Sequence, residues 1–78
     1  MRKAIDEDTL RALVENGALR EIQAVRVGQD DKWGLNARFS GRWLPIRSKR
    51  EPIRLWASLT AVGRFCEKVG VKNLQVEF

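Results

Sequence analysis

Apolar residues at helical spacing mark a first short helix near the start of the chain. Leu10, Leu13 and Val14 form one apolar stripe. Asp6 stands before the stripe, where its carboxylate can accept from free backbone N–H groups, and Asn16-Gly17 supplies a left-handed stop. We therefore predict a helix over about residues 7–16.

A second helical stripe lies near the end of the chain, between a Ser58 cap and a Gly70 stop. Its apolar positions follow a spacing of three and four residues. They are Leu59, Val62, Phe65, Cys66 and Val69. A strand should follow this helix, because Leu74, Val76 and Phe78 alternate with polar residues.

Between the two helices the pattern changes to the alternation of strands. The first strand contains Ile22, Val25 and Val27, with a phase slip that predicts a bulge between Ile22 and Val25. The clearest alternation follows a turn over Gly28–Asp31. It places Trp33, Leu35, Ala37 and Phe39 on one face of a strand, with Trp33 inside.

Two further strands complete the predicted meander. Ser40-Gly41 is a tight hairpin turn into a strand over Arg42–Ser48, in which Pro45 indicates an edge position or a bulge. After a charged loop, Ile53–Trp56 has the pattern of a brief fourth strand.

These patterns predict one small α+β domain over residues 1–78, in the order α-β-β-β-β-α-β. The sheet should be mainly antiparallel, with both helices on one face and most of the arginines on the open face. An unpaired edge strand would also allow a homodimer. The predicted core residues are Leu10, Leu13, Val25, Val27, Leu35, Phe39, Leu55, Leu59, Val62, Phe65, Val69, Leu74 and Val76.

Charge is distributed unevenly along the chain, whose formal net charge is +5. From Asp6 to Asp31, seven acids outnumber three arginines, for a net charge of −4. From Arg38 to Arg54, six bases meet only Glu51, for a net charge of +5. A basic middle segment would attract an anionic partner by long-range steering.

The residues of the usual catalytic and metal centres are scarce in this chain. It has no histidine, no tyrosine and one cysteine, so the commonest general base and the ligands of structural zinc are missing. Cys66 lies on an apolar stripe, where a thiol is inert. We therefore expect a protein without enzymatic activity, metal or cofactor.

Cell location follows from similar observations. A lone cysteine cannot form an internal disulfide, and Met1–Lys3 runs into Asp6–Asp8 without the apolar segment of a secretion signal. No stretch approaches the roughly 20 apolar residues of a membrane span. We expect a protein of the reducing cytoplasm that does not bind membranes.

The basic middle segment is the candidate binding site, because its cations are interleaved with tryptophans. Cations can neutralise phosphates and indole rings can stack on bases. The alternative is that this segment is a charged sheet face that is simply solvated and binds nothing. The sequence does not decide whether Trp43 and Trp56 face the core or a ligand. The candidate residues are Arg38, Arg42, Trp43, Arg47, Lys49, Arg50 and Arg54.

Two segments also carry a family resemblance. Residues 52–71, from Pro52-Ile53-Arg54 to Val69-Gly70-Val71, followed by Leu74–Phe78, resemble the ParC family of partition-associated proteins, which plasmids and integrative elements encode. The segment Leu10–Arg20 looks similar too. The resemblance implies an accessory protein of a mobile genetic element that takes part in DNA maintenance.

Two functions from different classes are compatible with these observations. The first is a non-enzymatic accessory that binds DNA or a DNA-processing protein through a basic sheet surface. The second is a small inhibitor, anti-CRISPR-like, that blocks a host complex by occupying its surface. Many such inhibitors are acidic mimics of DNA, whereas this chain is basic.

Overall fold

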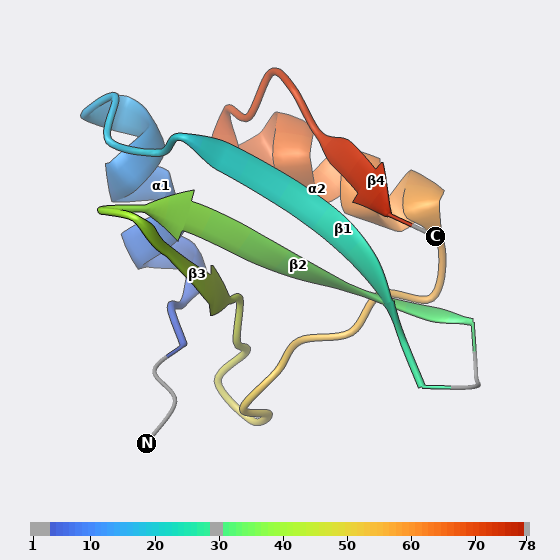
Figure 1. Ribbon diagram of the computed structural model, residues 1–78. Helices are drawn as coiled ribbons and strands as arrows, with labels where there is room; N and C mark the ends of the chain where they lie inside the picture. Colours follow the sequence, from blue (N-terminus) through green and yellow to red (C-terminus); the bar gives the residue numbers. More distant parts are fainter. Residues whose placement is uncertain (1–3, 29–30, 78) are drawn as a thin grey trace.

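The computed structural model describes residues 4–28 and 31–77, and it confirms the predicted α+β class (Figure 1). Two helices and four strands follow one another in a single small domain. In chain order they are α1 (Glu7–Glu15), β1 (Glu21–Val27), β2 (Lys32–Phe39), β3 (Arg42–Pro45), α2 (Leu59–Val69) and β4 (Gln75–Glu77).

The strands form one mixed sheet in the order β3-β2-β1-β4. The β1–β2 and β2–β3 pairs are antiparallel, whereas β4 pairs in parallel with β1. A parallel neighbour requires a crossover, and α2 provides it. Figure 1 shows both helices on one side of the sheet, so its other face is not covered by any described element.

Both predicted helix caps are present. The Asp6 carboxylate accepts from the Thr9 N–H at 2.8 Å, and the Ser58 hydroxyl accepts from the Ala61 N–H at 3.1 Å. The bond from the Thr9 backbone also lowers the pKa of Asp6, because it favours the ionised carboxylate. Gly70 ends α2 in the left-handed conformation, with φ of 90°.

The predicted hairpin between β2 and β3 is also confirmed. Ser40 and Gly41 both have positive φ, at 53° and 73°, as a two-residue turn that follows the twist of the strands requires. The turn predicted over Gly28–Asp31 includes residues 29–30, which lie outside the described residues.

The bulge predicted in β1 is wrong. Its register with β2 runs without interruption from Glu21 opposite Arg38 to Val27 opposite Lys32. The inward positions of β1 are Ile22 and Ala24, both buried. Since side chains alternate along a strand, Val25 and Val27 lie on the open face.

This change of phase accounts for part of the difference between the predicted and observed cores. Leu10, Leu35, Val62, Phe65 and Val69 are buried as predicted, and Leu13, Phe39, Leu59 and Leu74 pack against them half-buried. The predicted burial of Leu55 and Val76 is wrong, because these residues are 38% and 39% exposed. The buried residues absent from the predicted core are Ile5, Ile22, Ala24, Trp33, Ala37, Ile46, Trp56 and Cys66, of which Trp33 and Cys66 were placed inside by other arguments.

The predicted fourth strand over Ile53–Trp56 is reduced to one bridge. The Trp33 and Trp56 backbones exchange two hydrogen bonds, of 2.9 and 2.8 Å. β3 and Ile46 already occupy the rest of this edge of β2, so residues 47–53 loop away before the chain returns.

Two other strands are shorter than predicted. The strand expected over Arg42–Ser48 ends at Pro45. Ile46 still donates to the Leu35 carbonyl of β2 at 3.0 Å, and it also forms a parallel bridge with Ile5. β3 is an edge strand, as Pro45 indicated, and Ile5 covers part of its outer side by donating to the Pro45 carbonyl at 3.0 Å. The last strand spans Gln75–Glu77, and Phe78 lies outside the described residues.

Candidate nucleic-acid interface

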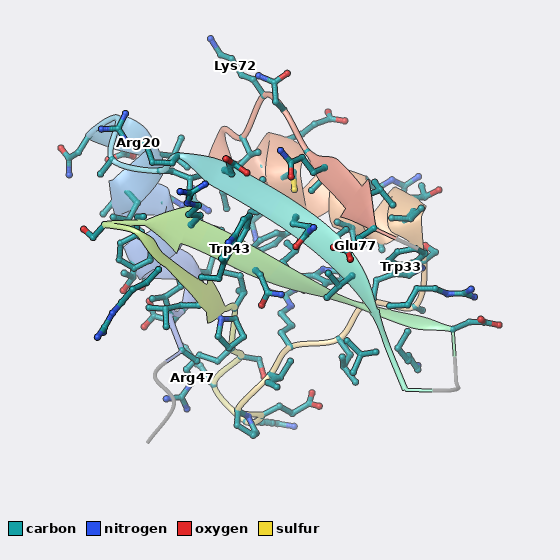
Figure 2. All side chains as sticks on the ribbon, in the orientation of Figure 1. Arg20, Trp33, Trp43, Arg47, Lys72 and Glu77 are labelled. Atoms are coloured by element: carbon teal, nitrogen blue, oxygen red, sulfur yellow. The ribbon has the colours of Figure 1, made fainter. Side chains whose placement is uncertain are left out.

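Trp43 lies on the uncovered face of the sheet. In the β2–β3 register its neighbour Leu44 pairs with the buried Ala37, whereas Trp43 pairs with Arg38. Adjacent side chains on a strand point to opposite faces, so Trp43 points away from the helices. The residue is 40% exposed. Figure 2 labels it on the sheet. Of the two tryptophans left open by the sequence, Trp43 therefore faces solvent.

Trp56 has the opposite environment. It is only 6% exposed and its ring centroid is 5.0 Å from that of Phe65 on α2. A tilted pair at this distance is a favourable aromatic contact within a core. Trp56 therefore belongs to the core.

Arg38 shares the open face with Trp43 but is paired with an acid. Its Nη1 lies 3.0 Å from Glu21 Oε1 on β1, and the other Glu21 oxygen accepts from Gln75 on β4 at 3.2 Å. Gln23 of β1 also donates to Glu77 of β4. Polar groups thus link β2, β1 and β4 across the sheet.

The open face is therefore not the arginine-rich surface that we expected. By register, the strand residues on this face that carry charge are Lys32 and Arg38 against Glu21 and Glu77, so their charges balance. Arg42 has the same parity as the inward Leu44, at the solvent-exposed end of β3. The alternation of side chains along the strands excludes the arginines from a common face.

Arg47, Lys49 and Arg50 lie beyond the other end of β3 in an ordered turn. The turn is closed by the Ser48 N–H donating to the Glu51 carbonyl at 3.1 Å and by the Glu51 N–H donating to the Ser48 hydroxyl at 3.0 Å. Its three cations are exposed, and Figure 2 shows Arg47 on this loop.

Arg54 lies on the helical side of the sheet. Its guanidinium carbon is 4.8 Å from the Trp56 ring centroid and 4.9 Å from that of Phe65, and its Nη1 is 3.5 Å from Glu7 Oε1. It is thus separated from the open face by the core. Arg54 does not belong to the same surface as Trp43, contrary to the expectation from sequence.

The remaining candidates follow one edge of the sheet, which we call the β3 surface. It consists of Arg38, Arg42, Trp43, Arg47, Lys49 and Arg50. Within residues 4–28 and 31–77, Arg42, Arg47, Lys49 and Arg50 form no ion pair with a carboxylate. Arg47 is nevertheless close enough to Asp6 for its charge to contribute to the lowered pKa of that residue.

The fold partly cancels the charge separation along the sequence. Acids of the first third reach cations of the basic middle at Glu7–Arg54 and Glu21–Arg38. Sequence alone did not reveal these pairs, since each joins residues far apart in the chain. The Glu7–Arg11 pair is different, because both residues lie on α1 and their spacing of four residues can be recognised in the sequence.

The described residues contain no group of three or more His, Cys, Asp or Glu side chains arranged to hold a metal ion. Burial raises the pKa of the Cys66 thiol to about 11, so the reactive thiolate is scarce at neutral pH. In the same part of the chain, neither helix has the length and apolar character needed to cross a membrane.

Comparisons of the chain with protein-family models, curated proteins and solved structures found no match. The geometry of the β3 surface is therefore the basis for assigning a function.

Proposed function

We propose that this chain is a non-enzymatic accessory protein that binds single-stranded nucleic acid along the β3 surface. The observation that carries the proposal is the position of Trp43. Its exposed indole lies on an uncovered sheet face. Arg42 belongs to the same strand, and Arg47, Lys49 and Arg50 follow the end of that strand. None of these four cations has an ion-pair partner among the described residues.

Each part of this surface suits one part of a nucleic acid. The indole of Trp43 offers a flat face on which an unpaired base can stack, a contact that tolerates any sequence. Arg42 at one end of β3 and Lys49 and Arg50 beyond the other end can neutralise phosphates on either side of that base. The need for an unpaired base favours a single strand over a duplex.

The role of this binding in a cell is also proposed. The resemblance to ParC family partition-associated proteins supports a role in the maintenance of a plasmid or another mobile element. In that setting the partner is DNA or a protein that processes DNA.

A second candidate is a protein-binding inhibitor of a host complex. It is favoured by the rest of the open face, where Val25 and Val27 of β1 lie on the same face as a charge-balanced polar network. The centres of protein interfaces are typically rich in aromatic and apolar groups and poor in charged residues.

The salt dependence of oligonucleotide binding tests the first candidate. Fluorescence anisotropy of a labelled thymidine oligonucleotide should report binding that weakens as salt rises. Four phosphate contacts on a single strand correspond to a slope of about −3 in a plot of log K against log salt. Substituting Arg42, Lys49 and Arg50 together by Gln should make that slope less negative by about 2.

Lys72 provides the control, because it is exposed, forms no ion pair in the described part of the chain, and lies away from β3 (Figure 2). The substitution Lys72→Gln should leave most of the slope intact. Absence of binding at low salt, or equal losses in both variants, would refute the proposed surface.

A further inference from the structure

Three cations share a single carboxylate on the helical side of the molecule. Glu7 lies 2.9 Å from Arg11 Nη2, 3.3 Å from Lys68 Nζ and 3.5 Å from Arg54 Nη1. These groups come from α1, α2 and the segment before α2. The cluster therefore has a net charge of +2, and no other ion pair of the described residues neutralises it.

Arg54 is held in place within this cluster. Its guanidinium lies over both the Trp56 and Phe65 rings, and its side chain is 34% exposed. Stacking on aromatic faces fixes the plane of the guanidinium while leaving its edge accessible. Its contact with Glu7 is an ion pair, and no hydrogen bond from its side chain occurs among the described residues.

The accessible side of Arg54 faces a shallow groove against α2. Arg64 and Lys68 are one turn apart on that helix, so they lie on the same side of it. Among the described residues the groove is lined by Arg54, Trp56, Ala61, Arg64, Phe65 and Lys68, and Glu7 contacts Arg54 and Lys68 from outside this lining. A ligand there would meet three cations and the edges of two aromatic rings.

We propose that this groove binds a phosphate group, held by Arg54 with Arg64 and Lys68 on either side. The fork of N–H donors on Arg54 matches two phosphate oxygens, and the flanking cations supply charge. A phosphate monoester or inorganic phosphate carries close to two negative charges near neutral pH, which matches the net +2 of the three groove cations and Glu7, the carboxylate that contacts two of them. The groove lies on the opposite side of the sheet from Trp43. Arg54 also lines a second pocket with Arg47 and Lys49 of the β3 surface, so Arg64 and Lys68 are the residues that distinguish this site from that surface.

Titration with inorganic phosphate tests the site directly. Amide and arginine Nε–H signals in ¹H–¹⁵N spectra should shift and saturate around Arg54, Arg64 and Lys68. Sodium chloride at equal ionic strength should not produce these shifts. A nucleoside monophosphate titrated in parallel distinguishes the two sources of the group. Equal affinity indicates a site for free phosphate, and tighter binding indicates a site for a phosphate attached to a larger ligand.

Matched variants separate this site from general attraction to a basic protein. Arg64→Gln with Lys68→Gln should weaken phosphate binding at least tenfold, and Arg20→Gln with Lys72→Gln should change it less than twofold. Arg54→Lys keeps the charge but loses the fork, so it should also weaken binding several-fold. Glu7→Gln removes the internal competitor and should tighten binding.

The proposal is overturned by shifts that are spread over all exposed cations, by equal shifts with chloride, or by unchanged affinity in the Arg64/Lys68 variant. Trp43→Ala should leave phosphate binding unchanged, so failure of the β3 surface and failure of this site can be told apart.

Discussion

Arg38 of β2 and Trp43 of β3 are cross-strand partners on the uncovered face of the sheet, while Arg38 also pairs with Glu21 at 3.0 Å on its other side. The residue opposite Trp43 is therefore an arginine whose charge is already balanced. Three cations that form no ion pair within residues 4–28 and 31–77 lie further along the same edge: Arg42, and Lys49 and Arg50 in the turn. In the proposed complex, Trp43 would therefore stack on a base, and Arg42, Lys49 and Arg50 would neutralise most of the phosphate charge.

The corrected core gives a first prediction, on a pair of leucines. Leu35→Ala should destabilise the domain by about 2–5 kcal/mol, because Leu35 is 1% exposed and its loss leaves a cavity. Leu55→Ala should change stability by less than about 0.5 kcal/mol, because Leu55 is 38% exposed. Urea unfolding followed by circular dichroism measures both, and a larger loss for Leu55→Ala would contradict the observed burial.

Two glycines of the second helix should respond in opposite directions to alanine. Gly63 lies inside α2 and a Cβ there meets nothing within 4 Å, so Gly63→Ala should stabilise the protein by about 0.5–1 kcal/mol. Gly70 has φ of +90° and its Cβ would lie 3.3 Å from Val14 Cγ1, so Gly70→Ala should destabilise it. Thermal unfolding measures both effects. A lower melting temperature for Gly63→Ala would contradict the open space found around Gly63 in α2.

Glu7 predicts a pH dependence of stability. Burial raises the pKa of Glu7, but hydrogen bonds and charges from Arg11 and Lys68 outweigh burial and hold it below the ordinary value of 4.5. A group whose pKa is lower in the folded state stabilises the fold above its unfolded pKa. Its contribution should therefore be complete above about pH 4.5 and disappear as the pH falls through the lower, folded value.

Comparison of Glu7→Gln with the wild type isolates this contribution. At pH 7 the variant should be less stable by about 1 kcal/mol, because the pairs lie near the surface. The difference should shrink in acid, where the wild-type carboxylate is protonated. Glu15→Gln, at an exposed position of the same helix without an ion pair in the described residues, serves as the control. A stability difference that stays constant with pH would show that Glu7 acts by packing alone.

The parts of the fold that sequence predicted are those governed by neighbouring residues. Asp6, Ser58 and Gly70 delimit the helices through local hydrogen bonds and backbone conformation, and their roles can be read from a few adjacent positions. The Ser40-Gly41 hairpin is similarly local. The fold class and the order of the elements, apart from the strand expected at Ile53–Trp56, followed from these signals.

The parts that sequence did not predict depend on contacts between distant segments. Ala24 is buried although Val25 is more apolar, because packing beneath the helices fixes the phase of β1. Strand pairing at residues 53–56 was limited to one bridge since β3 occupies the same edge. Arg54 changed from a candidate of the open face to a partner of Glu7 and Trp56, which alternation along an assumed strand did not indicate.

The affinity of Trp43 variants for a single-stranded oligonucleotide tests the central claim most directly. Loss of a stacked base should cost Trp43→Ala about 1–3 kcal/mol, or roughly 5-fold to 150-fold in affinity, while Trp43→Phe keeps most of the binding. Val25→Thr, on the same face, is the control and should bind like the wild type. Wild-type affinity in Trp43→Ala, or an equal loss in Val25→Thr, would contradict the claim that this surface binds nucleic acid by stacking on Trp43.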